Sequence, residues 1–302
     1  MDCINQAEQK FWQVGKDITI AGFEWRNDKP LALLSHANGF CAATWSLVVP
    51  YLLPHYHVIA FDFRGHGQSS KPPAPDAYQW HHLVDDVMVL TEMILSEKGA
   101  DQFALAAGNS LGGVITAAVA SEKPHLFKRA VMLDPPIVPN EETITRLGLD
   151  ISIKMKGPGP SLGDMARRRR LNWPSRDIPD EKWRTKPMFA SWEAPAFDLY
   201  LKYGFNDCPD GTVDLACPPE VEAAIFDLTG GINIFDRASR ISCPIQIVHA
   251  SRGNFPRALY QEFARLCPKG EFASIDGGHL LPMEVPELTA KFLLNDNLLD
   301  DK

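Results

Sequence analysis

The stretch that decides the fold is Phe103-Ala-Leu-Ala-Ala-Gly-Asn-Ser-Leu-Gly-Gly-Val-Ile-Thr-Ala-Ala-Val-Ala120. Its first five residues form a short apolar run typical of a buried strand, and the residues after Gly113 are typical of a buried helix. Between them, residues 108–112 match the pattern G-x-S-x-G. When this pattern joins a strand to a helix, it exposes a serine hydroxyl at the carboxyl end of the strand. We therefore predict that Ser110 lies on a tight turn at the edge of a sheet.

Short apolar runs alternate with helical patterns on both sides of this turn. Between two of the runs, apolar residues from Trp80 to Ile94 recur with the 3.6-residue spacing of a helix. Alternating strands and helices indicate an α/β fold with a mostly parallel, doubly wound sheet covered on both faces. The predicted strands are residues 31–36, 57–62, 103–107, 130–134, 245–249 and 272–275.

Residues 137–238 interrupt the alternation and contain no strand run of comparable strength. We predict a core formed by residues 1–136 and 239–302, with residues 137–238 inserted as an α-helical lid. A length of 302 residues fits one domain of roughly 200–250 residues with such an insertion. The insertion contains four consecutive arginines, 167–170. Spread around a helix they favour a solvated surface, with the alternative that one of them reaches inward to a carboxylate of the substrate.

The formal net charge of -8 argues against binding to nucleic acid or to an anionic membrane. The uncharged run 103–121 contains polar residues and three glycines, so we interpret it as buried structure rather than as a membrane span. Residues 1–6 have neither a cationic start nor an apolar run, and we expect a cytoplasmic monomer or homodimer acting on a small molecule. The six cysteines lack a C-x-x-C pair, so free thiols are expected, with a Cys208–Cys217 bridge as the minor alternative.

A serine hydroxyl becomes a useful nucleophile only when a base removes its proton. With this type of turn the triad follows the order serine, acid, histidine along the chain. His279 follows the last predicted strand and precedes the last predicted helix, and no other histidine lies so late with these flanks. We therefore predict His279 as the base. The sequence shows no cluster with metal-ligand spacing and no G-x-x-x-x-G-K loop, so we expect chemistry without a metal or a cofactor.

Four segments in the same order resemble the α/β-hydrolase superfamily, in its branch with a helical lid. The resemblance covers roughly residues 20–136 and 240–298, and it implies the fold predicted above. Its segments are the serine turn, Ser35-His-Ala-Asn-Gly-Phe40 followed by Trp45, Asp62-Phe-Arg-Gly-His-Gly-Gln-Ser69, and Gly278-His279 with Glu284 and Pro286.

The resemblance also implies an oxyanion hole made of two backbone N–H groups, aimed at charge that develops only in the transition state. Leu111, directly after the serine, supplies one of them. The family's spacing points to Asn38 for the other, with Phe40 as the weaker choice. We expect the substrate to contact Asn109, Phe40 and Trp192, because aromatic residues of the lid should line an apolar pocket.

The acid is where the sequence departs from the family pattern. Most members carry it after the strand that corresponds to residues 245–249, but Ala250-Ser-Arg-Gly-Asn254 contains no carboxylate. A variant of the family carries the acid one strand earlier, where Asp134 ends the predicted strand 130–134. We predict Asp134 as the acid, with Asn254 or no acid as alternatives. A strand-end aspartate that merely bonds loop amides is the structural alternative for Asp134.

We consider three functions from the sequence alone. The leading prediction is a serine hydrolase that cleaves a small or medium apolar carboxylic ester through an acyl-enzyme, and the other two are alternatives. The second is a carbon–carbon bond hydrolase of ring-fission-type diketo acids, since Gly108-Asn-Ser110 resembles the serine turn of that group. The third is a non-catalytic ligand receptor on the same fold, suggested by the displaced acid.

Overall fold

The computed structural model describes residues 3–149 and 160–294. Residues 150–159 of the predicted lid and residues 295–302 of the predicted core lie outside this description. The strands of the main sheet are β1 (Glu8–Gly15), β2 (Ile18–Trp25), β3 (Leu31–Ser35), β4 (His57–Phe61), β5 (Leu105–Asn109), β6 (Ala130–Leu133), β10 (Ile245–Ala250) and β11 (Gly270–Ile275). Their order is β1-β2-β4-β3-β5-β6-β10-β11, parallel from β4 to β11 and antiparallel where β2 meets β1 and β4.

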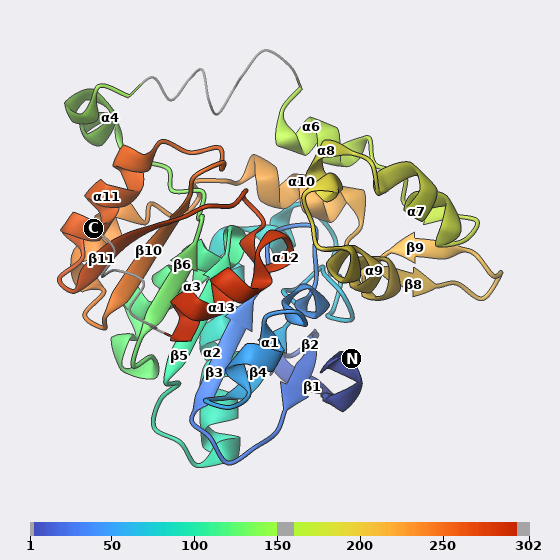
Figure 1. Cartoon of the computed structure of the whole chain (residues 1–302), viewed down its shortest axis with the longest axis horizontal. Helices are drawn as coiled ribbons and strands as arrows, with labels where there is room; N and C mark the ends of the chain where they lie inside the picture. The colour runs from blue at the N-terminus through green and yellow to red at the C-terminus, as the bar shows by residue number, and fades with distance from the viewer. Residues whose placement is uncertain (1–2, 150–159, 295–302) are drawn as a thin grey trace.

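Helices cover both faces of this sheet, as the alternating pattern predicts (Figure 1). Strands β3, β4, β5 and β6 are buried along their whole length, which explains why they appear as continuous apolar runs. One face carries α2 (Trp80–Lys98), α3 (Leu111–Glu122) and α11 (Arg257–Leu266), and the other carries α1 (Val49–Leu52) and α13 (Pro286–Leu294). The remaining short helices of this part are η1 (Cys3–Gln6), η2 (Ala42–Trp45), η3 (Asp76–Tyr78), η4 (Pro124–Leu126) and α12 (Leu281–Glu284).

The predicted elements differ from the structure at three places. The strand before Ser110 runs two residues beyond the predicted 103–107, so Gly108 and Asn109 belong to it. A short helix, α12, precedes the last predicted helix, which corresponds to α13 and begins at Pro286. The β1–β2 hairpin escapes prediction because its edge strand β1 alternates exposed residues with buried or half-buried ones, such as Trp12 and Val14, instead of forming an apolar run.

The segment between β6 and β10 also contains strands, so the expectation of a purely helical insertion is wrong. Its strands are only two or three residues long, which is too short to give an apolar run. They pair in the order β7-β9-β8 as a separate small sheet. The elements of this segment are α4 (Glu141–Leu147), α6 (Leu162–Arg167), β7 (Asn172–Trp173), α7 (Asp177–Trp183), α8 (Pro187–Ala190), α9 (Ala194–Tyr203), β8 (Phe205–Asp207), β9 (Val213–Leu215), α10 (Pro219–Asp227) and η5 (Phe235–Arg240).

Most of this segment gathers at one end of the large sheet. Figure 1 shows α6 to α10 together with the small sheet, whereas α4 lies apart from them beside α11. An ion pair of 2.6 Å joins Arg146 of α4 to Glu262 of α11. We refer to the elements from α6 to α10 as the lid, after the predicted insertion. The interior of this lid is a cluster of aromatic rings, in which Trp183 stacks on Phe189 at 5.7 Å.

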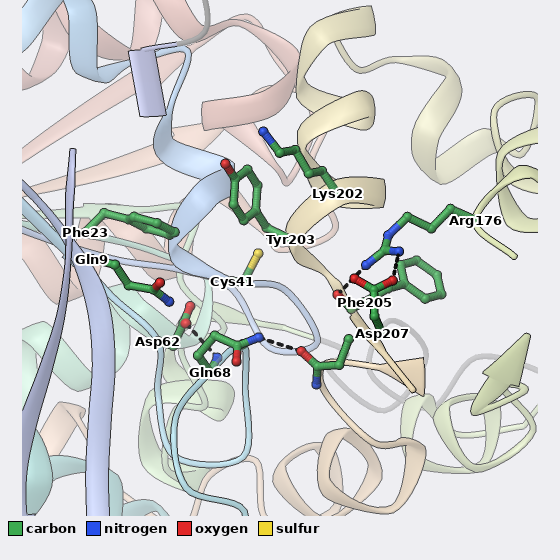
Figure 2. Close-up of a pocket in the computed structure, with 12 residues that line it drawn as sticks. Gln9, Phe23, Cys41, Asp62, Gln68, Arg176, Lys202, Tyr203, Phe205 and Asp207 are labelled. Carbon is green, nitrogen blue, oxygen red and sulfur yellow. Dashed lines mark hydrogen bonds and ion pairs between the residues drawn. The ribbon is translucent and has the colours of Figure 1, made fainter. Parts of the chain in front are cut away.

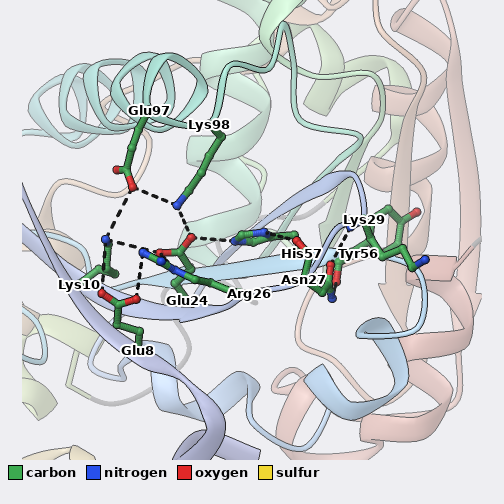
Figure 3. Close-up of polar contacts among 10 residues, drawn as sticks. All are labelled: Glu8, Lys10, Glu24, Arg26, Asn27, Lys29, Tyr56, His57, Glu97 and Lys98. Atoms are coloured by element: carbon green, nitrogen blue, oxygen red, sulfur yellow. Dashed lines mark hydrogen bonds and ion pairs between the residues drawn. The ribbon is translucent and has the colours of Figure 1, made fainter.

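A network of charged side chains joins β2 to the last turn of α2 (Figure 3). Glu24, whose side chain is fully buried, accepts a hydrogen bond of 2.8 Å from His57 and pairs with Lys98. Burial alone would raise the pKa of Glu24, but the bonds from Lys98 and His57, with the charges of Lys98 and Arg26, lower it to about 2. The carboxylate is therefore charged at neutral pH and joins two elements of the core.

Two further observations concern the described residues. None of their helices combines the length and the apolar character that crossing a membrane requires. No disulfide joins any of the six cysteines, all of which lie in the described part of the chain, so the Cys208–Cys217 bridge considered above is not formed.

Candidate active site

Ser110 occupies the turn between β5 and α3 in a conformation that few side chains adopt. Its backbone angles are φ 55° and ψ -119°, and such strain costs on the order of 1–3 kcal/mol. The glycines on either side permit the close contacts of the turn. A β-carbon on Gly108 would lie 2.1 Å from the carbonyl carbon of Gly112, and one on Gly112 would lie 2.4 Å from the carbonyl oxygen of Ser35. The G-x-S-x-G pattern is thus dictated by packing around the serine.

The structure brings Ser110, His279 and Asp134 into one chain of hydrogen bonds. The hydroxyl of Ser110 lies 2.9 Å from Nε2 of His279, and Nδ1 of His279 lies 2.7 Å from Oδ2 of Asp134. A neutral imidazole with its proton on Nδ1 donates to the carboxylate and accepts from the serine. Asp134 is fully buried, while the side chain of His279 is 26% exposed. This geometry suits a serine nucleophile, a histidine base and an acid that orients it.

Asp134 follows β6 and has a left-handed backbone with φ 43°. Its Oδ1 accepts a hydrogen bond of 3.0 Å from the Ala250 N–H and another of 3.0 Å from the hydroxyl of Tyr260. Asp134 therefore bonds a loop amide, which is the structural role considered above as the alternative to a catalytic one. It also bonds His279. In the loop that lacks a carboxylate, Gly253 leaves room for Asp134, because a β-carbon there would lie 2.6 Å from Oδ2.

Two side chains hold the backbone around the triad. The carboxylate of Glu284 accepts the N–H groups on both sides of His279, from Gly278 at 2.9 Å and from Leu280 at 3.1 Å. The amide nitrogen of Asn109 donates to the carbonyl of His279 and to the carbonyl of Leu133, both at 3.0 Å. Asn109 thus links the serine turn to the segments that carry the base and the acid. Its Oδ1 is buried and has no hydrogen-bond partner among the described residues.

The backbone N–H groups of Leu111 and Asn38, which are predicted to bind an oxyanion, have no acceptor among residues 3–149 and 160–294. Leu111 is the first residue of α3, and an N–H at that position has no acceptor within its own helix. In the other loop, Gly39 donates to Nε2 of His66 at 3.0 Å and Phe40 donates to the carbonyl of Ala37 at 3.2 Å. Because both are occupied, the unpaired N–H of Asn38 is favoured over that of Phe40 for the oxyanion role.

Residues of the lid also contact the loop that contains Asn38 and Phe40. The side chain of Asn38 donates to the carbonyl of Glu222 in α10 at 3.0 Å. The ring of Phe40 lies 5.4 Å from Trp192 and 5.2 Å from Tyr200. Trp192 is buried, and its indole N–H has no partner among the described residues. Its predicted contact with the substrate remains a prediction.

The four arginines do not share one helix, because α6 ends at Arg167. Arg169 turns inward, pairs with Glu222 and donates to the hydroxyl of Tyr200 at 2.9 Å. Burial would lower the pKa of Arg169, but the neighbouring Tyr200 and Glu222 raise it, so the guanidinium stays charged. The inward arginine is therefore already occupied by two partners of the lid.

A cleft of about 410 Å³ separates the lid from the N-terminal hairpin (Figure 2). Phe23 and Tyr203 line it, and a hydrogen bond of 2.5 Å from Gln68 to Asn206 crosses it. None of the triad residues lines this cleft, so it does not mark the place where Ser110 would meet a substrate. Among residues 3–149 and 160–294, no group of three or more His, Cys, Asp or Glu side chains is arranged to hold a metal ion.

Comparison with known proteins agrees with the fold. A family model described as the alpha/beta hydrolase fold matches residues 33–151, a range that includes Ser110 and Asp134. The chain has the α/β-hydrolase fold. A protein of Acinetobacter baylyi named (E)-2-((N-methylformamido)methylene)succinate hydrolase is 34% identical to it over 125 residues. The match covers 41% of this chain and 44% of that relative, which is less than half of either.

Solved α/β-hydrolase structures match nearly the whole chain. E-2-(acetamidomethylene)succinate hydrolase superposes with a TM-score of 0.73 at 21% identity, covering 96% of this chain and 98% of that one. A thioesterase domain from the curacin biosynthetic pathway gives a TM-score of 0.71 at 18% identity, covering 95% and 99%. At these identities the likeness shows the fold.

Several residues that hold the site carry no sequence signal that relates them to it. Tyr260 lies on an amphipathic helix, where a tyrosine indicates core packing rather than a contact with the acid. Glu222 and Arg169 lie in the lid, and no local pattern relates them to the oxyanion loop. Glu284 belongs to the quoted histidine segment, but only the fold shows that its carboxylate bonds the backbone beside His279.

Proposed function

We propose that this α/β-hydrolase is a serine hydrolase that cleaves a small or medium apolar carboxylic ester through an acyl-enzyme. The observation that carries the proposal is the chain of two hydrogen bonds, 2.9 Å from Ser110 to His279 and 2.7 Å from His279 to Asp134. A nucleophile, a base and an orienting acid in this geometry are what acyl transfer requires.

In the acylation step the oxygen of Ser110 attacks the ester carbonyl while its proton moves to Nε2 of His279. The negative charge that forms on the carbonyl oxygen is stabilised by the N–H groups of Leu111 and Asn38. The imidazolium, held by Asp134, then gives its proton to the leaving alkoxide. The carbon–oxygen bond of the ester breaks, an alcohol leaves, and the acyl group stays on Ser110.

Deacylation repeats the same steps with water as the nucleophile. His279 takes a proton from water, the resulting hydroxide attacks the acyl carbon, and the proton returns to the oxygen of Ser110 as the acid product leaves. The free enzyme is restored, and the balance is one ester and one water for one acid and one alcohol.

An apolar substrate is supported by the residues that close over the oxyanion loop. Phe40 and Trp192 are buried aromatic side chains on the two sides of the boundary between lid and core. We propose that these two side chains contact the acyl group or the alcohol. We also propose that residues 137–238 act as the lid that determines the substrate, on a core of residues 1–136 and 239–302.

A second candidate is a hydrolase of an unsaturated, carboxylate-bearing substrate. Two relatives are named for a methylene succinate that carries an amido group, and the Gly108-Asn-Ser110 turn favoured the carbon–carbon bond hydrolases. The same triad would serve such a substrate, because the attack on a carbonyl carbon is unchanged. Against it, Arg169 already pairs with Glu222, so the inward arginine of the lid offers no unpaired charge to a substrate carboxylate.

A substrate panel separates the two candidates. The purified protein is incubated with nitrophenyl esters of two to eight carbons, with an acetamidomethylene succinate, and with a 1,5-diketo dienoic acid, and Ser110→Ala is the control for each. The proposal expects turnover of the esters that Ser110→Ala abolishes. Turnover of the succinate or the dienoic acid with inert esters contradicts the ester assignment and selects the second candidate.

A further inference from the structure

Tyr260 makes a contact with the triad acid that the catalytic steps above do not use. Its hydroxyl lies 3.0 Å from Oδ1 of Asp134 and 2.9 Å from the carbonyl oxygen of Pro135. The side chain is fully buried, so water does not compete for the hydroxyl. A hydroxyl prefers a charged acceptor to a neutral one, and the carboxylate is the stronger of its two acceptors.

The position of this hydroxyl is fixed by packing. Tyr260 lies on α11, which is buried against the sheet through Leu259 and Phe263. The ring of His249 on β10 packs edge-on against the ring of Tyr260, at 5.1 Å between centroids. A tyrosine has few side-chain torsions, so a ring held on two sides directs its hydroxyl to one place.

The three donors to Asp134 have different functions. The hydrogen-bond partner of Oδ2 among the described residues is His279, while Oδ1 receives the Ala250 N–H and the Tyr260 hydroxyl. A carboxylate with both donors on Oδ1 cannot rotate about its Cβ–Cγ bond without losing them. Burying a carboxylate without such donors is costly, and each lost bond to a charged group weakens the site.

We propose that Tyr260 is a positioning residue, whose hydroxyl orients the carboxylate of Asp134 so that Oδ2 faces His279. The inference deepens the proposed function, because it assigns the support of the triad acid to α11. Burial, together with the charge of Asp134, keeps the pKa of Tyr260 well above its usual value, so the hydroxyl remains a donor at any working pH.

Few other ionisable groups lie around this pair. His249 faces Tyr260 from β10, and Glu284 bonds the backbone beside His279. Arg252 and Asp276 pair with each other on the exposed loops next to the site. A change confined to the hydroxyl of Tyr260 therefore acts on the Asp134–His279 bond without removing another charge.

The test is Tyr260→Phe, which keeps the ring and removes only the hydroxyl. Tyr78→Phe is the matched control, because the hydroxyl of Tyr78 is equally buried and donates to a backbone carbonyl, that of Pro72, at 2.8 Å. Two measurements are made on each variant. The first is the pH profile of kcat/KM on the preferred ester, and the second is the low-field proton resonance of Nδ1 of His279 in the resting protein.

Without the hydroxyl, more negative charge remains on the carboxylate and stabilises the imidazolium. We expect kcat/KM to fall about tenfold and the acid limb of the profile to move to higher pH by about half a unit to one unit. We expect the Nδ1 resonance to move downfield, while Tyr78→Phe matches the wild type in both measurements.

An acid limb and a resonance that stay unchanged in Tyr260→Phe would overturn the inference, even if activity fell, since a fall alone reports packing. The resonance is recorded without substrate, so it separates this inference from the proposed function. A shifted resonance in a protein that hydrolyses no ester supports the role of Tyr260 and contradicts the ester assignment.

Discussion

Gly253 lies directly against the carboxylate of Asp134: a β-carbon on residue 253 would be 2.6 Å from Oδ2 and 3.0 Å from Oδ1. Residue 253 belongs to the loop after β10, which carries the acid in most proteins that this sequence resembles. The loop contains no carboxylate between residues 250 and 254, and Gly253 leaves space for the carboxylate of Asp134 at the end of the neighbouring strand. The two strand ends therefore share one place for an acid beside His279.

This relationship predicts that the acid can be moved. Asp134→Ala should lower kcat by about 10³- to 10⁴-fold, because the imidazolium loses its partner. Adding Gly253→Asp to that variant should raise kcat at least about tenfold above that of Asp134→Ala. The new β-carbon is close enough to the position of Oδ2 for the introduced carboxylate to reach it. In the wild type, Gly253→Asp alone should lower activity, because two carboxylates would occupy one place.

The control for this experiment is Asn254→Asp in the Asp134→Ala background. Asn254 is the adjacent residue, and the side-chain hydrogen bonds of the triad within the described part of the chain do not involve it. Kinetics on the preferred ester compare the two double variants. Equal recovery at 253 and 254, or recovery only at 254, would argue against a shared place for the acid.

Asn109 should matter to the geometry of the triad rather than to substrate affinity. Asn109→Asp keeps the shape but loses both donated hydrogen bonds, to the carbonyls of His279 and Leu133. We expect kcat to fall about 10- to 100-fold with little change in KM, because each lost buried bond costs about 1–3 kcal/mol. The same loss should appear with the smallest ester. A rise in KM with an unchanged kcat would instead support the predicted contact between Asn109 and the substrate.

Stability should depend on pH through Glu24. Its pKa in the folded protein is about 2, against 4.5 for an unperturbed glutamate. A lowered folded pKa means that the contribution of this group is complete above about pH 4.5 and is lost as the pH falls from there towards 2. At pH 7, Glu24→Gln should lower the free energy of unfolding by about 1–3 kcal/mol.

Urea unfolding between pH 7 and pH 3 measures this contribution. The difference between the wild type and Glu24→Gln should shrink as the pH falls. The exposed Glu8 in the same cluster provides the control, and Glu8→Gln should change stability little at any pH (Figure 3). A difference for Glu24→Gln that is constant across this range would contradict the assigned ion pairs.

The parts of the fold that the sequence predicts are those with local signals. The predicted α/β-hydrolase fold is confirmed. It could be predicted because buried parallel strands form continuous apolar runs in the sequence and because the serine turn requires Gly108 and Gly112. The lid sheet and the β1–β2 hairpin escaped prediction, since two-residue strands and half-exposed edge strands produce no such run.

The same distinction applies to the candidate site. Ser110 and His279 each lie in a short motif, and Asp134 follows from the order of the strands once the usual loop is seen to lack an acid. Tyr260 contacts Asp134 through its hydroxyl, and Glu222 contacts Asn38 through its main-chain carbonyl. Each lies more than a hundred residues from its partner in the chain. Only the three-dimensional arrangement brings them together.

Labelling by a fluorophosphonate, followed by mass spectrometry of the intact chain and its peptides, measures directly whether Ser110 is an activated nucleophile. We expect one adduct, located on Ser110, with labelling slowed at least about 10³-fold in His279→Ala and in Asp134→Ala. A folded wild type that takes up no label at Ser110 would contradict an activated serine. So would a His279→Ala variant that is labelled as fast as the wild type. The first of these results would instead favour a ligand receptor on this fold.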